Sequence, residues 1–144
     1  MQHNKIEQEG RYIVLEGLVD GIPLTLVAIY PPNANQAGFL GTLTPVIIRN
    51  PHAPMLWAGD FNCVPNTDAD CSTPPLLQAT SKRTTQHFQM WLSNWRLTDA
   101  WRMGHPMGRE YSYYSTLHNI HTRIDLFFCT AQLGGLCFRI QILG

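Results

Sequence analysis

The stretch Met55 to Cys63, with the sequence Met-Leu-Trp-Ala-Gly-Asp-Phe-Asn-Cys, constrains the fold of this chain more than any other. Its apolar start is typical of a buried strand, and Gly59 lets the backbone turn or be approached closely. Asp60 and Asn62 follow at the carboxyl end of that strand, where ligands bind in open α/β sheets. On alternate positions, a carboxylate and a carboxamide can point to the same side. The pair therefore predicts a site for a divalent cation and a phosphate.

The flanking sequence alternates strand-like and helix-like segments. Two β-type runs around Asp20-Gly21 predict a hairpin that ends at Tyr30-Pro-Pro-Asn33. Apolar residues at helical spacing predict an amphipathic helix over 84–96, entered through Ser81 or Thr84 as a cap, with its tryptophans in the core. We further expect a helix over 36–49, a strand over 54–58, a surface loop over 63–81, consecutive antiparallel strands over 111–115 and 123–129, and a strand over 136–142.

Composition limits the classes of protein that fit. With 144 residues, 44% of them hydrophobic, the chain can form one packed domain or part of one. Lys plus Arg equals Asp plus Glu at ten each, so phosphate recognition has to be local. No stretch has the character of a signal peptide or a membrane span, and we expect an intracellular protein with no membrane contact, for which the nucleus is a suitable compartment. The cysteines do not have zinc-site spacing and are expected to be buried thiols: Cys63, Cys71, Cys129 and Cys137.

A second acid, Asp125, stands within the apolar run Arg123-Ile-Asp-Leu-Phe-Phe. An acid in a strand is costly unless it meets a partner or a wet cleft, so a catalytic role and a structural pairing with Arg123 or a turn amide are both open. Asp99 fits an ion pair with Arg102 or a helix cap better than catalysis. Tyr30 could offer its hydroxyl to a phosphate or belong to the core.

Five blocks occur in an order that resembles the endonuclease/exonuclease/phosphatase superfamily. Within that superfamily the chain is most similar to the apurinic/apyrimidinic-endonuclease-like domain of LINE-type non-LTR retrotransposons. The blocks are Ala28-Ile-Tyr-Pro-Pro-Asn33, Ala58-Gly-Asp-Phe-Asn62, Thr98-Asp-Ala-Trp-Arg102, Glu110-Tyr-Ser-Tyr-Tyr-Ser115 and Arg123-Ile-Asp125.

The resemblance implies a two-sheet α/β sandwich of the DNase I-like type and a hydrolysis of phosphodiesters that uses Mg²⁺, with Mn²⁺ as a substitute. It implies that Asp60 contacts the metal and orients or deprotonates water, and that Asn62 bonds the phosphate. Tyr30 and Asn33 would add hydrogen bonds, and Asp125 would pair with a downstream histidine. Ser112 and Arg123 would lie at the DNA-contacting surface.

The resemblance also implies partners and a boundary. DNA would be the substrate, nicked on one strand, and the parent protein would carry a reverse transcriptase. The family's first strands with a metal-binding Glu, and its final Ser-Asp-His block, have no counterpart in residues 1–144. We therefore expect a partial, incomplete domain that is weak or inactive alone. A phosphatase or phosphodiesterase acting on inositol phosphates or lipids, and a non-catalytic binding scaffold, are the alternatives.

Overall fold

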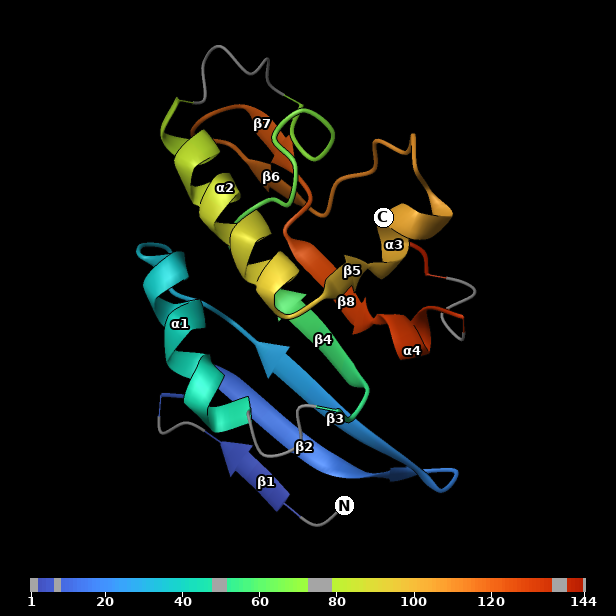
Figure 1. Cartoon of the computed structure of the whole chain (residues 1–144). Coiled ribbons are helices and arrows are strands. Elements are labelled where there is room, and N and C mark those ends of the chain that lie inside the picture. The colour runs from blue at the N-terminus through green and yellow to red at the C-terminus, as the bar shows by residue number, and fades with distance from the viewer. Residues whose placement is uncertain (1–2, 7–8, 48–51, 73–78, 136–139, 144) are drawn as a thin grey trace.

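A mixed six-stranded sheet forms the centre of the molecule, which a computed structural model describes for residues 3–6, 9–47, 52–72, 79–135 and 140–143 (Figure 1). Its strands are β1 (His3–Ile6), β2 (Tyr12–Val19), β3 (Ile22–Ile29), β4 (Met55–Asp60), β5 (Leu97–Asp99) and β8 (Asp125–Thr130). Their order is β1-β2-β3-β4-β8-β5, and only β3 and β4 run parallel. A second sheet consists of β6 (Tyr113–Ser115) and β7 (Ile120–Thr122). The predicted α/β class with two sheets is confirmed.

The β2–β3 hairpin turns where the sequence predicted it. Asp20 and Gly21 both have positive φ, at 50° and 78°, as the two central residues of a tight hairpin turn require. Every residue from Tyr12 to Val19 pairs with β3. The hairpin therefore carries the chain back to the middle of the sheet, beside β4.

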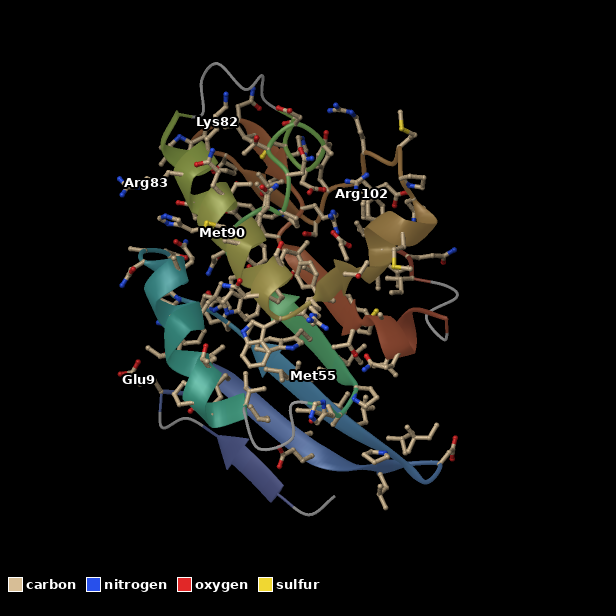
Figure 2. All side chains as sticks on the ribbon, viewed as in Figure 1. Glu9, Met55, Lys82, Arg83, Met90 and Arg102 are labelled. Atoms are coloured by element: carbon tan, nitrogen blue, oxygen red, sulfur yellow. The ribbon has the colours of Figure 1, made fainter. Side chains whose placement is uncertain are left out.

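Two helices cover one face of the sheet, α1 (Gln36–Ile47) and α2 (Ala79–Asn94) (Figure 1). Helix α1 continues through Pro45 and buries Leu40 and Leu43, so burial outweighs the hydrogen bond lost at Pro45. Helix α2 begins before the predicted residue 84, which places Ser81 and Thr84 inside the helix rather than at its cap. Lys82 and Arg83 project outward from it (Figure 2).

The space between these helices and the sheet is filled by aromatic side chains. Trp57 of β4 is fully buried and meets Trp91 of α2 edge to face, with ring centroids 4.8 Å apart. Phe61 contacts both Phe88 of α2 and Phe128 of β8, at 5.5 and 5.1 Å between centroids. Trp91 of α2 belongs to the core and Trp95, just after the helix, packs against it, as predicted.

The pairing predicted for the last strands is wrong. Residues 111–115 do not pair with 123–129; β6 pairs with β7 instead, and β8 pairs with β4 and β5. A two-strand hairpin over 113–122 satisfies its own backbone groups locally, which frees β8 to enter the main sheet. Residues 140–142, which were predicted to be in a strand, have no regular structure, and 136–139 lie outside the described residues. Short helices α3 (Ala100–Gly104) and α4 (Ala131–Gly134) follow β5 and β8.

Gly59 lets β3 and β4 approach closely, so that β4 extends past the predicted Ala58 to Asp60. Its φ is 149°, and a Cβ at this position would lie 2.0 Å from the carbonyl oxygen of Ile29. Only glycine accommodates both conditions without a shift of the backbone. Asp60 therefore lies at the carboxyl end of β4, next to the carboxyl end of the parallel strand β3.

Gly59→Ala is expected to lower the free energy of unfolding by about 2–3 kcal/mol, because it combines an unfavourable φ with a clash against backbone. Gly41→Ala is a matched control in helix α1, where an added Cβ meets nothing within 4 Å. That change should raise the free energy of unfolding by about 0.5–1 kcal/mol. Urea unfolding followed by tryptophan fluorescence measures both variants, and equal values would contradict the role given to Gly59.

Candidate active site

Asp60 and Asp125 face each other as cross-strand partners, at the end of β4 and the start of β8. Directly opposed residues of antiparallel strands place their side chains on the same face of the sheet. Asp60 is half-buried, whereas Asp125 is exposed and is the first residue of its strand rather than an interior one. The sheet therefore brings together the two acids that the sequence singled out.

Burial raises the pKa of the Asp60 carboxyl, and the negative charge of Asp125 raises it further; the hydrogen bond from the Asn62 amide acts in the opposite direction. Two carboxylates that repel each other bind a cation more readily than either would alone. A bound cation would therefore reduce the repulsion between the carboxylates of Asp60 and Asp125.

Asp60→Asn is expected to raise the free energy of unfolding at neutral pH. A carboxyl whose folded-state pKa is raised contributes stability below its unfolded pKa, and that contribution is lost as pH rises through the folded pKa. The advantage of the amide should therefore be present at pH 7 and vanish once the pH falls below the ordinary pKa of an aspartate. Urea unfolding at pH 3, 5 and 7 measures it, and a variant that is less stable than the parent at pH 7 would contradict the assignment.

Asn62 does not continue the strand alternation predicted for it, because the chain turns at this residue with φ of 51°. Its backbone N–H donates to Asp60 Oδ1 at 2.9 Å, and its Nδ2 donates to the Pro31 carbonyl at 2.8 Å. An Asx-type turn thus fixes the carboxylate of Asp60. The carboxamide has a second N–H that this bond does not use.

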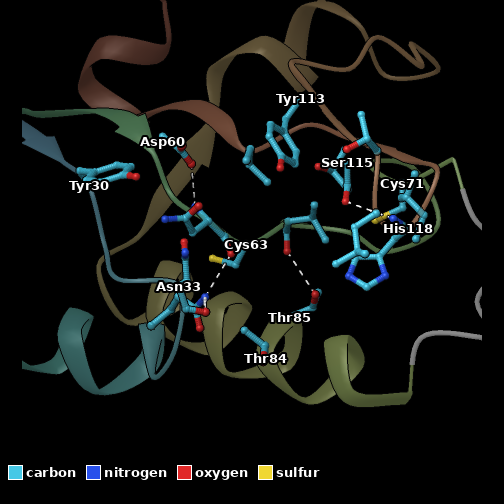
Figure 3. Close-up of a pocket in the computed structure, with 18 residues that line it drawn as sticks. Tyr30, Asn33, Asp60, Cys63, Cys71, Thr84, Thr85, Tyr113, Ser115 and His118 are labelled. Carbon is cyan, nitrogen blue, oxygen red and sulfur yellow. Dashed lines mark hydrogen bonds between the residues drawn. The ribbon is translucent and has the colours of Figure 1, made fainter.

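Tyr30 and Asn33 lie beside Asn62 and line the same hollow (Figure 3). The Tyr30 ring is half exposed, with the Arg11 guanidinium 5.4 Å from its centroid. Gln36, which sequence analysis missed, donates from Nε2 to the carbonyls of Asn33 and Asn62 at 2.8 and 3.2 Å. A glutamine at the start of a helix is common, so nothing in the sequence indicated that Gln36 connects Asn33 with Asn62.

The hollow beside Asp60 has a volume of about 860 Å³ and extends between helix α2 and the β6–β7 hairpin. Hydroxyl groups are prominent in its lining, as Figure 3 shows for Thr84, Thr85, Tyr113 and Ser115. Hydroxyls both donate and accept hydrogen bonds without carrying charge. Apolar side chains line the hollow as well, among them Val64, Leu117 and Ile124, so its wall mixes hydroxyl and apolar groups.

A smaller hollow of about 680 Å³ lies on the other side of Asp60, and Ser112 and Asp125 line it. The Ser112 hydroxyl oxygen accepts the backbone N–H groups of Ile124 and Asp125, each at 3.1 Å. This turn-like contact holds the start of β8 against the segment before β6. Asp60 is shared by both hollows and is the point where the predicted site residues meet.

Arg123 borders the smaller hollow, but almost none of its surface is exposed for the DNA contact that the resemblance implied. Its side chain is 1% exposed and forms ion pairs with Asp70 at 2.8 Å and Asp99 at 2.5 Å. The pairing of Asp125 with Arg123 is therefore wrong as well. Asp99 caps helix α3, as the sequence allowed, but its ion-pair partner is Arg123, whereas Arg102 pairs with Asp70.

A divalent cation fits the chemistry of the acidic pair. No group of three or more His, Cys, Asp or Glu residues gathers within the described ranges. Mg²⁺ is commonly held by only one or two carboxylates together with waters and substrate phosphates, and Asp60 and Asp125 match that pattern.

The described cysteines are buried thiols, as the sequence predicted. Cys63 and Cys71 are buried and line the larger hollow. Burial raises the pKa of the Cys63 thiol to about 12 and that of Cys71 to about 11, and nearby aspartates add to both shifts. Cys129 is also buried, and Cys137 lies outside the described residues. His118 lies in the β6–β7 turn, whereas His121 belongs to β7, with its ring tilted by 32° to that of Tyr114 and the ring centroids 4.5 Å apart.

Known proteins share this fold. A family model described as the endonuclease/exonuclease/phosphatase family matches residues 3–142. AP endonuclease LMAP from Leishmania major has a TM-score of 0.65 at 20% identity, and the match covers 90% of this chain and 48% of that one. An AP endonuclease from Archaeoglobus fulgidus gives 0.65 at 17%, with 89% and 55% covered, and the Xenopus laevis APE2 catalytic domain gives 0.65 at 20%, with 89% and 48% covered. The chain spans about half the length of these structures, and the likeness confirms the predicted DNase I-like fold.

None of the helices in the part of the chain that the structure describes combines the length and the apolar character needed to cross a membrane.

Proposed function

The chain belongs to the endonuclease/exonuclease/phosphatase family, and from this premise we propose that it supplies part of the catalytic centre of a metal-dependent DNA-nicking phosphodiesterase. The observation that carries the proposal is the cross-strand pair of Asp60 and Asp125, with the Asn62 turn beside it. Both acids line a hollow that Ser112 borders. A carboxylate pair next to a neutral amide suits a reaction in which charge accumulates on a phosphate.

In this proposal Asp60 orients the attacking water or accepts a proton from it. Asn62 offers the second N–H of its carboxamide to a phosphate oxygen. Asp125 would orient a histidine of the longer polypeptide near the phosphate, as the resemblance implies. Mg²⁺ or Mn²⁺ bound to Asp60 would polarise the phosphate and neutralise charge on it.

The DNA strand would lie along the larger hollow, with Tyr30 and Asn33 at one end. Neutral hydroxyl groups line this hollow, and the chain has ten cationic and ten acidic side chains, so general attraction to the phosphate backbone is small. Binding would therefore depend on local hydrogen bonds and on the metal. Ser112 would set the position of the segment that leads into β6.

We assign the domain to a LINE-type retroelement protein that also carries a reverse transcriptase, acting where DNA is accessible, such as the nucleus. The support is the five ordered sequence blocks from Ala28 to Asp125. A reverse transcriptase in the same open reading frame would support this assignment. An open reading frame that encodes a different domain beside this one would overturn it.

The test of the function is nicking of supercoiled plasmid with Mg²⁺, by this chain and by the parent polypeptide at the full length of the related structures. We expect clear nicking by the longer polypeptide, and weak or no nicking by the 144 residues alone. Among described residues, no histidine lines the smaller hollow with Asp125. Hydrolysis of inositol phosphates or phospholipids with intact plasmid would favour the phosphatase alternative, and binding of DNA without cleavage of any phosphate ester would favour the scaffold.

A further inference from the structure

The buried carboxylate of Asp70 and the partly exposed carboxylate of Asp99 hold the guanidinium of Arg123. Its Nε donates to Asp70 Oδ1 at 2.8 Å, and its Nη2 donates to Asp99 Oδ2 at 2.5 Å. The side chains of Arg123 and Asp70 are each 1% exposed. A buried charge without a partner is unfavourable, so the two carboxylates leave Arg123 one well-defined position.

The same carboxylates join three separate segments of the chain. Asp70 belongs to the loop after β4, Asp99 ends β5, and Arg102 of α3 donates to Asp70 Oδ1 at 2.6 Å. The guanidinium carbons of Arg102 and Arg123 lie 4.8 and 4.7 Å from the Trp101 ring centroid. Charge-assisted and cation–π contacts therefore lock these segments together.

Arg123 is only two residues before Asp125, and its backbone is fixed as well. Its N–H donates to the Asp70 carbonyl at 2.9 Å, and the Phe61 N–H donates to the Ile124 carbonyl at 2.8 Å. Phe61 directly follows Asp60. The backbone of residues 123–125 therefore connects the Arg123 ion pairs directly to Asp125.

We propose that Asp70 and Asp99 are positioning residues that fix Arg123 and, through the backbone of residues 123–125, keep Asp125 opposite Asp60. The inference rests on the proposed function insofar as it treats Asp60 and Asp125 as the reacting pair. The competing explanation is that the cluster only stabilises the fold. The two explanations differ in whether a change at Asp70 acts on Asp60 through Asp125.

Cross-strand NOEs between the backbone protons of Asp60 and Asp125, which are paired residues of β4 and β8, separate the two explanations. Asp70→Asn keeps the shape but removes the charge, so Arg123 loosens and Asp125 moves away from Asp60. We expect this variant to weaken these NOEs, whereas the cross-strand NOEs between β2 and β3 keep their intensity. Unchanged NOEs between Asp60 and Asp125, or an equal loss throughout the sheet, overturn the proposal.

Asp99→Asn provides a second variant if Asp70→Asn does not fold, because asparagine retains the N-cap of α3. In either variant, hydrogen exchange of the Phe61 amide should be about tenfold faster while the β2–β3 hairpin amides stay unchanged. Uniformly faster exchange throughout the chain overturns the proposal. Asp68→Asn is the matched control, since Asp68 is an exposed acid in the same loop as Asp70.

These readouts do not depend on cleavage of DNA. If Asp70→Asn leaves the NOEs between Asp60 and Asp125 unchanged while the longer polypeptide nicks plasmid, the positioning role fails and the nuclease proposal stands. If the NOEs weaken but no phosphate ester is cleaved, the proposed function fails and the geometric role of Asp70 and Asp99 remains.

Discussion

Asp60→Asn is expected to reduce plasmid nicking by the longer polypeptide about 10²- to 10⁴-fold, the range that positioned acid–base groups contribute. The amide keeps the acceptor oxygen for the Asn62 N–H, so the turn that follows β4 remains. What it loses is the negative charge that faces Asp125 and the capacity to accept a proton. The loss should appear in kcat, measured at saturating plasmid with Mg²⁺, because the substitution leaves the surrounding walls of the hollow in place.

Asp20→Asn is the matched control for this experiment. Asp20 is an exposed acid in the β2–β3 turn, and asparagine tolerates its positive φ of 50°. Its nicking rate should equal that of the parent. Because Asp60→Asn is also expected to be more stable than the parent at pH 7, inactivity cannot be attributed to unfolding. Unchanged nicking by Asp60→Asn would remove Asp60 from the reaction.

Arg123→Met is expected to lower the free energy of unfolding by about 3–5 kcal/mol, the usual cost of removing one partner from a buried ion pair. Methionine fills much of the same volume, so the loss reflects charge more than packing. Asp70 keeps its ion pair with Arg102, whereas Asp99 loses its ion pair with Arg123. Urea unfolding at pH 7 measures the difference.

Arg83→Met serves as the control for Arg123→Met, because Arg83 is exposed and projects outward from α2 (Figure 2). Surface substitutions of this kind usually change stability by less than about 0.5 kcal/mol. A similar small value for Arg123→Met would mean that its ion pairs barely outweigh the cost of burying them. Loss of stability near that of a large core truncation would instead confirm that the buried cation has no replacement.

The sequence predicted those parts of the fold whose signals are local. Asp20-Gly21 determines its hairpin through backbone geometry, and the spacing of Phe88 and Trp91 determines which face of α2 is buried. Asp60 could be found because a glycine and an acid directly after an apolar strand are unusual. Local sequence patterns did not place Asp125 beside Asp60, and only the family resemblance joined them in one site. The register of β4 and β8 brings the two residues opposite each other.

Features that depend on distant segments could not be predicted. Asp70 stands in a polar loop, where nothing distinguishes a buried acid from the exposed Asp68 nearby. The family resemblance placed Arg123 at the DNA-contacting surface, yet two carboxylates from other segments make its burial possible. The pairing of β6 with β7 was missed because both candidate partners of residues 111–115 have similar β-type composition.

The buried thiols of Cys63 and Cys71 can report motion of the hollow beside Asp60. With pKa values of about 12 and about 11, both thiols are almost entirely protonated at pH 7, and both side chains are covered by protein atoms. Both thiols line the larger hollow and are less than a tenth exposed, so an alkylating reagent should modify them faster when the walls of that hollow move apart. The rate of alkylation, followed by mass spectrometry, would report how often the walls beside Asp60 part.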